Sequence, residues 1–474
     1  MNKYKSLLVN IGIFAITTVA TKLTTFLLVP LYTYYLTTSE YGISDMSTLV
    51  VGIVAPIGTF AIGDAVLRFM IDDKDQAADI ASIGIAVTCF SCIIVLLLLP
   101  LLDLPAFGGL GEYRWLFLLS YIAYSFQDLF GRIARGNNQL KIITIASVAS
   151  SLCTAGCAVI FIAFLKQGLL GFFYSYICGL TIGSLIFLIV GKHYMYIQLI
   201  SWNTVVQLLR KMTPYAIPLI PNNVLWLFNT SINRLFITSM IGIAASGLFA
   251  ASYKIPNLLN TLYSVFFQAW TLSSFQEYRK TDVNRFFSVV LTLLNALLVV
   301  AGSLIILLSP WLASWFLQKE FYEGWIYMPI LILALYFNSL ASFWGSIYTM
   351  VMKTKYILVS TIVSAIVCMI STWFLIPYIG LFGAAIGMVL SNLVLLGIRM
   401  LFARRFIRIH ILTCSTITSA VFLILQAVLM TLRPQLYNLV AVLAMIICIV
   451  QIISVLRVFK QFQVSKWWKR SHVL

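Results

Sequence analysis

Three basic residues lie within long apolar stretches of the sequence, where charged side chains are rare. They are Lys22, Arg234 and Lys254. A charged side chain at the centre of a membrane-spanning helix costs at least ~2.5 kcal/mol on insertion scales. Arg can bind a phosphate through two parallel hydrogen bonds, and Lys binds it as a point charge. Together the three residues would form a cationic pocket for a phosphate-bearing headgroup.

Each of these residues also has a plainer interpretation. Lys22 lies near the middle of its stretch, yet a long Lys side chain close to a helix end can extend to the membrane surface. Arg234 could lie at the outer interface of a helix that is merely kinked. Lys254 lies beside Pro256 in the following stretch. The pocket requires all three side chains to face one cavity, which the sequence leaves open.

The stretch that carries Arg234 is unusually polar for a membrane helix. It holds Pro214, Pro218, Pro221, Asn222 and Asn223. Proline removes a backbone hydrogen bond and bends a helix, and a broken helix inside a membrane is tolerated only where it lines protein or a water-filled cavity. We therefore predict that this helix forms a cavity wall, with Asn222 and Asn223 among the substrate-binding residues.

The residue patterns of enzymes are missing from the sequence. It contains no Gly-Lys-Ser/Thr phosphate loop, no cluster of metal-ligating side chains and no nucleophile with a matched base. The eight cysteines all lie inside apolar stretches, where they are predicted to pack between helices without a disulfide or a metal. We therefore predict a protein that is not an enzyme and holds no cofactor.

The composition identifies the medium in which these residues lie. Of the 474 residues, 61% are hydrophobic and 9% are charged, whereas a soluble protein is roughly half apolar and roughly a quarter charged. A run of about 20 apolar residues can cross a bilayer, and such runs recur along the whole chain. Because hydrocarbon offers backbone groups no partner, each run must be helical. The sequence predicts an all-α polytopic membrane protein.

About fourteen transmembrane helices are predicted from the apolar runs and the polar breaks between them. They lie near residues 8–36, 43–66, 80–102, 113–131, 142–165, 170–190, 213–240, 245–272, 286–308, 325–350, 357–377, 381–402, 411–431 and 436–457. Boundaries inferred in this way are uncertain by several residues.

The basic residues orient these spans. Of the 31 Lys and Arg residues, twenty-four fall in loops on one side of the predicted spans, Arg132 and Arg399 among them, and only four fall on the other side. Cytoplasmic loops carry such an excess, so both termini are predicted to be cytoplasmic. Membrane topology therefore accounts for the net charge of +17 without a nucleic-acid partner.

Two short patterns indicate an internal repeat. Gly168-Leu169-Leu170-Gly171 and Gly380-Leu381-Phe382-Gly383 follow equivalent spans, 212 residues apart, and Gly42 and Gly247 follow the first and seventh spans, 205 residues apart. Helices one to six would then recur as seven to twelve in a parallel repeat, as in many transporters. We predict a six-helix lobe at 1–212, a second at 213–410, and an additional helix pair with a basic cytoplasmic tail at 411–474.

Several segments resemble those of a known family. The longest runs from Lys353-Thr-Lys-Tyr-Ile to Leu375-Ile-Pro-Tyr-Ile-Gly-Leu-Phe-Gly-Ala-Ala385, and shorter ones are Glu40-Tyr41-Gly42, Asn233-Arg234-Leu235-Phe236 and Gln268-Ala269-Trp270. In these segments the chain resembles the polysaccharide and O-antigen repeat-unit flippases (Wzx-like) of the multidrug/oligosaccharidyl-lipid/polysaccharide exporter superfamily.

The resemblance implies a function in surface polysaccharide biosynthesis. The substrate would be an oligosaccharide linked to undecaprenyl pyrophosphate, moved across the bacterial cytoplasmic membrane by alternating access through a central cationic cavity. Coupling to a proton or sodium gradient, and cooperation with a polysaccharide polymerase and glycosyltransferases, are implied as well. Family members often carry an acid just before the arginine of the seventh helix, where this chain has Asn233.

Two other functions stay open within the same superfamily. A lipid II flippase would need a similar cationic cavity. A cation-coupled multidrug antiporter would instead favour carboxylates within the membrane, whereas the mid-span charges of this chain are basic. Adjacent glycosyltransferase and polymerase genes would favour the oligosaccharide flippase.

Overall fold

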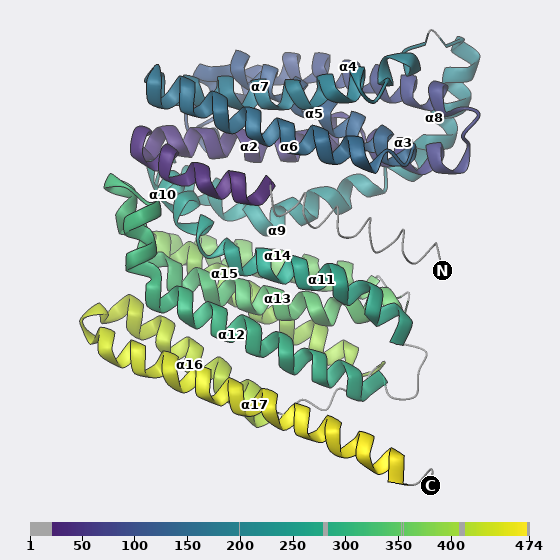
Figure 1. Cartoon of the computed structure of the whole chain (residues 1–474). Helices are drawn as coiled ribbons and strands as arrows, with labels where there is room; N and C mark the ends of the chain where they lie inside the picture. The colour runs from purple at the N-terminus through teal and green to yellow at the C-terminus, as the bar shows by residue number, and fades with distance from the viewer. Residues whose placement is uncertain are drawn as a thin grey trace. The chain divides into compact units, whose positions relative to one another are not determined.

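The structure, a computed structural model, describes residues 21–198, 200–277, 283–351, 353, 355–406 and 413–471, with the side chains in these ranges except at 222–231, 268–269, 271–277, 413–416 and 458–471. All regular secondary structure in these ranges is helical (Figure 1). Nine helical segments in the described ranges are long and apolar enough to cross a membrane, with mean hydropathies of 1.3 to 3.0. The chain is thus an all-α, multi-pass membrane protein.

The chain folds as two compact units, of which the N-terminal one comprises Met1–Ala250 and Gln318–Glu320. Its helices are a first helix described over residues 21–35, α2 (Thr38–Gly58), α3 (Ile62–Asp72), α4 (Ala77–Leu98), α5 (Arg114–Gly136), α6 (Leu140–Ala158), α7 (Gly168–Ile189), α8 (Trp202–Ala216), α9 (Leu219–Met240) and the first part of α10 (Ile243–Lys254). Short 3-10 helices lie at Leu99–Asp103, Pro105–Phe107, Leu110–Tyr113 and His193–Tyr196, and a π-helical turn, Val159–Phe164, extends α6.

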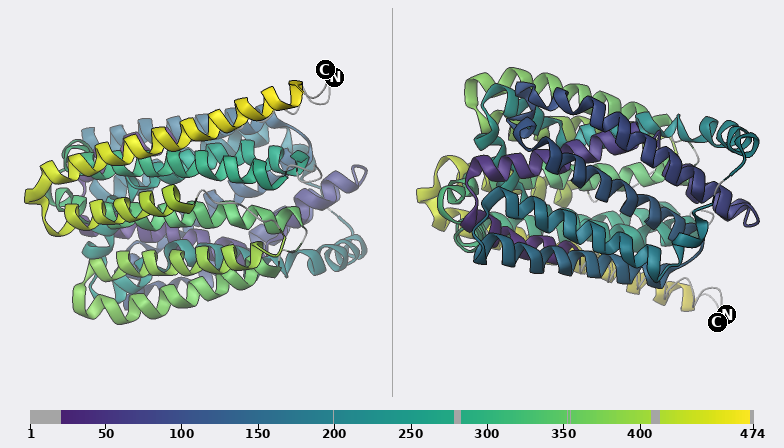
Figure 2. Two further views of the ribbon diagram at one scale, coloured as in Figure 1. Left: turned by 90° about the horizontal axis from the view of Figure 1, so that it is seen from below. Right: turned by 90° about the horizontal axis from the view of Figure 1, so that it is seen from above.

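The C-terminal unit comprises Ala251–Leu317 and Phe321–Leu474. After the end of α10 it contains α11 (Asn257–Glu277), α12 (Val283–Phe316), α13 (Met328–Met350), α14 (Lys355–Ile379), α15 (Leu381–Ala403), α16 (Thr413–Leu432) and α17 (Tyr437–Ser471), with 3-10 helices at Lys319–Tyr327 and Pro434–Leu436. The last two helices, drawn in yellow-green and yellow, lie side by side and both contact α12 (Figures 1 and 2). They form the additional pair that follows the predicted repeat.

Each unit has its own apolar core. In the N-terminal unit one cluster joins α3, α4, α5 and α8, and a second joins α2, α5 and α7. The core of the C-terminal unit is rich in aromatic rings, and the Trp270 and Phe343 rings stack there with centroids 4.8 Å apart. The Trp270 indole also donates to the Ser346 hydroxyl over 2.9 Å, which satisfies the one polar atom of a buried ring.

The predicted repeat is visible in the two Gly-Leu-x-Gly turns. Gly168 and Gly380 have φ angles of 54° and 56°, a left-handed conformation that glycine adopts without steric penalty. A Cβ on Gly171 would lie 3.1 Å from the backbone of Phe161, and a Cβ on Gly383 would lie 2.5 Å from that of Leu375. In both units the second glycine therefore lets two helices approach at backbone distance.

The unequal length of the two copies has a structural explanation. Lys141 precedes Gly168 by 27 residues, whereas Lys355 precedes Gly380 by 25. The helical segments before the two turns have the same length of 25 residues, at Leu140–Phe164 and Lys355–Ile379. Gly380 directly follows the second segment, whereas the link 165–167 separates the first segment from Gly168. The additional residues of the first copy therefore lie in this link.

Three of the predicted spans are interrupted. The span predicted at 43–66 breaks at Thr59–Ala61, where Phe60 and Ala61 have left-handed φ angles of 51° and 49°. The spans predicted at 213–240 and 245–272 break at turns that contain Pro218 and Pro256. The prolines of the first of these two predicted a bend. The break after α2 has only Pro56, three residues before it, as a sequence signal.

The division into compact units falls within α10, after Ala250. The helix α9 belongs to the N-terminal unit because it packs on α2. A repeat and a compact unit are defined by different criteria, and sequence repetition places the boundary at residue 212. The lobes at 1–212 and 213–410, with the additional pair at 411–474, therefore stay a prediction.

Candidate functional site

The predicted site residue Arg234 lies on α9 and forms an ion pair with Asp45 of α2. The Nη1 atom of Arg234 is 2.8 Å from Oδ2 of Asp45, and the two side chains are only 16% and 8% exposed. The contact is electrostatic rather than a well-aligned hydrogen bond, because Oδ2 has no hydrogen-bond partner of suitable geometry. Arg234 therefore has a compensating charge, and the pair as a whole is neutral.

The acid of this pair comes from a different position than the family resemblance implies. Position 233, just before the arginine, carries a buried Asn233. Asp45 lies on another helix, 189 residues away in the sequence. A partner at such a separation can be identified only when the packing of α2 on α9 is known, and sequence spacing therefore gave no signal for it.

The start of α2 is fixed by local interactions. Thr37 caps the helix by accepting from the Glu40 backbone N–H at 3.2 Å, and the Glu40 carboxylate accepts from the Thr37 backbone N–H at 2.8 Å. This reciprocal pattern is a capping box, which the sequence Thr37-Thr-Ser-Glu40 encodes. It holds the first turn of the helix, so that Asp45 is presented from the second turn.

Close packing at two glycines holds α2 against α10. A Cβ on Gly42 would overlap the carbonyl oxygen of Ile243, and a Cβ on Gly247 would overlap the carbonyl oxygen of Thr38. Thr38 and Ile243 are the first residues of the two helices and are separated by 205 residues, as the glycines are. Each glycine thus contacts the first residue of the equivalent helix, a reciprocal pattern like that of a two-fold interface. This pattern supports the predicted parallel repeat.

The other predicted site residues have different placements. Lys22 is half-buried in the described part of the first helix, within the N-terminal unit. Lys254 is also half-buried, and it is the last residue of α10, within the C-terminal unit. A cation is favoured there because the backbone carbonyls of a helix end carry partial negative charge. The side chains of Asn222 and Asn223 lie outside the described residues.

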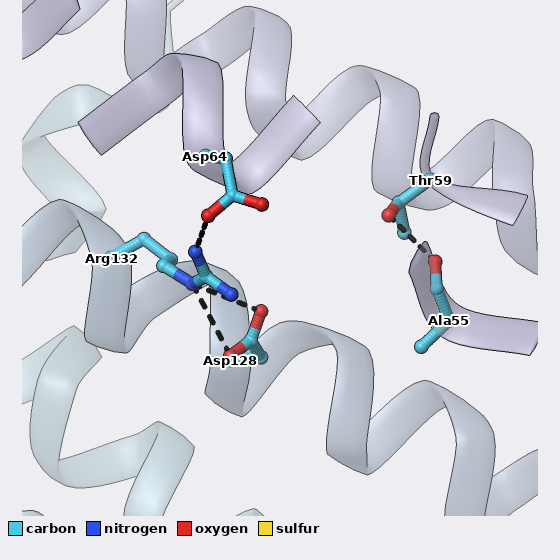
Figure 3. A network of polar contacts seen from close by, with 5 residues as sticks. All are labelled: Ala55, Thr59, Asp64, Asp128 and Arg132. Carbon is cyan, nitrogen blue, oxygen red and sulfur yellow. Dashed lines mark hydrogen bonds and ion pairs between the residues drawn. The ribbon is translucent and has the colours of Figure 1, made fainter. Parts of the chain in front are cut away.

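A second charged cluster joins α3 to α5. The Arg132 guanidinium forms an ion pair with Asp64 of α3 and lies 3.4 Å from the Asp128 carboxylate on its own helix (Figure 3). Asp64 lies in the first turn of α3, where the helix dipole favours a carboxylate. At the nearby break, the Thr59 hydroxyl donates to the Ala55 carbonyl at the end of α2 (Figure 3). The cluster therefore connects α5 to the half-helix that follows the break.

The structure corrects the predicted position of Arg399. The pattern of basic residues predicts a cytoplasmic loop for Arg399, but this residue lies inside α15 and is 8% exposed. Its guanidinium donates to the Ala341 carbonyl at 3.0 Å, the Ser360 hydroxyl at 3.2 Å and the Thr361 hydroxyl at 3.3 Å. The sequence does not distinguish a buried Arg399 from a loop residue, because Arg399 lies close to the end of its apolar run. Basic loop residues also occur at that position.

The comparisons with known proteins come from sequence and from structure. The model of the family described as polysaccharide biosynthesis protein matches residues 7–275 of the chain. Among curated proteins, none is similar enough in sequence to match.

Solved structures give the fold. A lipid II flippase, MurJ, in an inward closed conformation has a TM-score of 0.70 at 14% sequence identity, over 92% of this chain and 97% of that chain. A multidrug resistance MATE family transporter in an inward-facing conformation has a TM-score of 0.67 at 16% identity, over 81% of this chain and 94% of that chain. A multidrug resistance MATE family transporter in an outward-facing conformation has a TM-score of 0.56 at 16% identity, over 84% of this chain and 95% of that chain.

The structural likeness is too remote in sequence to carry an activity, but the family match covers more than half of the chain. The chain belongs to the polysaccharide biosynthesis protein family, and its fold is that of the MATE and MurJ membrane proteins.

Proposed function

We propose that the protein is a flippase that moves a polyprenyl-pyrophosphate-linked oligosaccharide across the cytoplasmic membrane for surface polysaccharide biosynthesis. The observation that carries the proposal is the half-buried position of Lys22, Arg234 and Lys254 within helical segments of a chain from this family. Cations within a membrane mark the pathway of a substrate or ion in many transporters. The pyrophosphate of the lipid is an anion that these three side chains could bind.

The Arg234–Asp45 ion pair suggests how this anion binds. Without substrate, Asp45 neutralises the guanidinium at 2.8 Å. A pyrophosphate offers several oxygens to the same guanidinium and allows bidentate contacts. Binding would therefore exchange one anionic partner of Arg234 for another. The buried Asp45 carboxylate loses its counter-charge in this exchange and would have to take up a proton or a cation.

The chemistry of the substrate fits alternating access. The oligosaccharide is too polar to cross hydrocarbon unaided, whereas the polyprenyl chain can stay in the bilayer while the head passes through the protein. We propose entry at the cytoplasmic side, where the glycosyltransferases act, and release to the polymerase on the outer side, with both termini cytoplasmic. A proton or sodium gradient would drive the cycle.

The two alternatives make different predictions for a deletion strain. A lipid II flippase is expected to be essential, because its loss stops peptidoglycan synthesis. A multidrug antiporter is expected to change the sensitivity of the cell to organic cations without affecting surface polymer. The proposed flippase predicts loss of surface polysaccharide and accumulation of the lipid-linked oligosaccharide on the cytoplasmic side.

Complementation of such a deletion strain tests the role of the cations. Lys22→Gln and Lys254→Gln should each fail to restore surface polysaccharide, with protein levels equal to wild type by immunoblotting. Arg433→Gln, an exposed cation at the loop between α16 and α17, is the matched control and should complement fully. Normal polymer levels in both lysine variants would rule out a cationic substrate pathway.

A further inference from the structure

The N-terminal unit contains a cavity whose lining includes none of the three predicted cations. It has a volume of about 260 Å³ and is formed by α5, α6 and α7. Its polar lining includes Tyr124, Gln127, Asp128, Arg135, Ser147 and Tyr176. The α5 members recur at intervals of three or four residues and so share one face of the helix. The cavity lies towards the ends of α5 and α6 that meet near residue 138, on the predicted cytoplasmic side.

The charges around this cavity cancel. Arg132, which also lines it, is bound between Asp64 and Asp128 (Figure 3), and Arg135 adds the second positive charge. Asp128 lines the cavity, and Asp64 pairs with Arg132 without being part of the lining. The cluster as a whole therefore holds two negative and two positive charges, and it has no net charge with which to select an anion.

The cavity offers many hydrogen-bonding groups in a small space. Its lining presents hydroxyl, amide, carboxylate and guanidinium groups, and the Asp128 side chain among them is 47% exposed. Gln127 is held against the backbone of α7, because a Cβ on Gly183 would overlap its amide nitrogen. Two tyrosine rings supply apolar faces beside the polar atoms. This combination suits a neutral ligand that carries several hydroxyl groups on a compact apolar ring.

The volume limits the size of the ligand. Pockets for drug-sized molecules measure roughly 300–1,000 Å³, and the cavity at about 260 Å³ lies just below this range. One sugar ring fits this space, whereas a whole oligosaccharide does not.

We infer that this cavity is a subsite for one neutral sugar residue of the oligosaccharide, distinct from the cations that bind its pyrophosphate. The inference rests on the proposed flippase function, to which it adds a determinant of sugar specificity. The subsite lies on the predicted cytoplasmic side, where the oligosaccharide is assembled. It would therefore bind one sugar of the substrate before transport.

Transport by the purified full chain in proteoliposomes tests the inference with two lipids. One is the lipid-linked oligosaccharide extracted from the deletion strain, and the other is undecaprenyl pyrophosphate without sugar. Gln127→Leu and Ser147→Ala should each slow flipping of the first lipid about three- to tenfold, the effect of losing one hydrogen bond, and leave the second unchanged. Ser151→Ala, one turn further along α6 and not part of the lining, is the control.

Equal slowing of both lipids, or no slowing of either, would overturn the subsite. Failure of the wild-type protein to flip any pyrophosphate-linked lipid would instead remove the proposed function, and the two failures are thus distinguishable.

A direct binding measurement tests the sugar subsite even if the wild-type protein flips no pyrophosphate-linked lipid. Saturation-transfer NMR with glucose, galactose and N-acetylglucosamine should detect binding of at least one sugar to the wild-type protein and its loss in the Gln127→Leu/Ser147→Ala double variant. Inorganic pyrophosphate should not compete. Binding of none of the sugars, or displacement of the sugar by pyrophosphate, contradicts the inference.

Discussion

The two units of the molecule stabilise the arginines within their helices in different ways. In the N-terminal unit, Arg234 and Arg132 each face aspartate carboxylates. In the C-terminal unit, Arg399 donates only to hydroxyl and carbonyl oxygens, and among the described residues no carboxylate forms an ion pair with it. The sequence explains this difference, because the chain contains no Asp or Glu after Glu323.

The difference indicates that Arg234 can exchange its partner for a ligand, whereas Arg399 keeps its partners. The carboxylate partner of Arg234 can be replaced by another anion, such as a pyrophosphate, provided that Asp45 then gains a proton or a cation. Arg399 instead connects α13, α14 and α15 through three neutral acceptors, and the Tyr348 hydroxyl donates to its carbonyl oxygen at 2.5 Å. We therefore expect Arg234 to act in transport and Arg399 to act in the stability of the C-terminal unit.

Breaking the Arg234–Asp45 pair should have the largest effect on stability. Arg234→Gln leaves the buried Asp45 carboxylate without its counter-charge, which typically costs about 3–5 kcal/mol. The expected result is a lower midpoint in denaturant titrations of the purified protein in mixed micelles. The double variant Arg234→Gln/Asp45→Asn should recover most of this loss, since both charges are then absent. A single variant as stable as the wild type would show that the pair contributes no compensating charge.

Replacing Arg399 should lower the free energy of unfolding by less than replacing Arg234. Arg399→Met removes the charge together with the donors, and the remaining partners are neutral acceptors, so we expect a loss of about 2–3 kcal/mol in the same titration. No second substitution of an acid should rescue it. A loss larger than that of Arg234→Gln would contradict the contrast between the two units.

The glycines at the start of α2 and α10 test the equivalence of the two copies of the repeat. Gly42→Ala and Gly247→Ala each insert a methyl group against a backbone carbonyl of the other helix, and we expect similar losses of about 1–2 kcal/mol. Gly156→Ala is the control, because a Cβ there meets no atom within 4 Å. Sensitivity at only one of the two glycines would contradict the reciprocal contact.

The smallest expected effect on stability comes from His193, a buried histidine without a charged partner among the described residues. It lies in the 3-10 helix after α7, fully buried, with Nε2 3.0 Å from the Gln139 Oε1 atom and Nδ1 without a partner among the described atoms. Burial lowers the pKa of His193 from 6.5 to about 4. Unlike Arg399, the His193 side chain is therefore uncharged at neutral pH.

The sign of the pH effect follows from this lowered pKa. Between pH 6.5 and 4 the unfolded chain binds a proton that the folded protein does not, so stability falls as the pH falls. By pH 5.5 the loss should be about 1 kcal/mol. Denaturant titrations at pH 7.0 and 5.5 should show it for the wild type, and it should be absent in His193→Gln. An equal pH dependence in that variant would assign the effect to other groups.

Much of the fold could be predicted because it follows from local patterns. Apolar runs identify the helices, and the two Gly-Leu-x-Gly turns identify the repeat. The bend at Pro218 was also predictable, because proline removes a helical hydrogen bond wherever it occurs. The break at Thr59–Ala61 was missed, since two non-glycine residues with positive φ leave little trace in a sequence and are held there by the surrounding structure.

The candidate site was predictable only in part. A charge inside an apolar stretch can be identified in the sequence, and Lys22, Arg234 and Lys254 are predicted as site residues in this way. The partner of a charge depends on packing between distant segments, so the pairing of Arg234 with Asp45 and of Arg132 with Asp64 could not be found. Arg399 was missed because a position near the end of a span can equally belong to a loop.

The central claim is that Arg234 exchanges Asp45 for the pyrophosphate of a lipid-linked oligosaccharide. The most direct measurement is the flipping rate of the extracted lipid-linked oligosaccharide in proteoliposomes, for the wild type and for the stability-matched double variant Arg234→Gln/Asp45→Asn. We predict rapid flipping by the wild type and a loss of at least tenfold in the folded double variant. A double variant that flips the lipid at the wild-type rate would contradict the account.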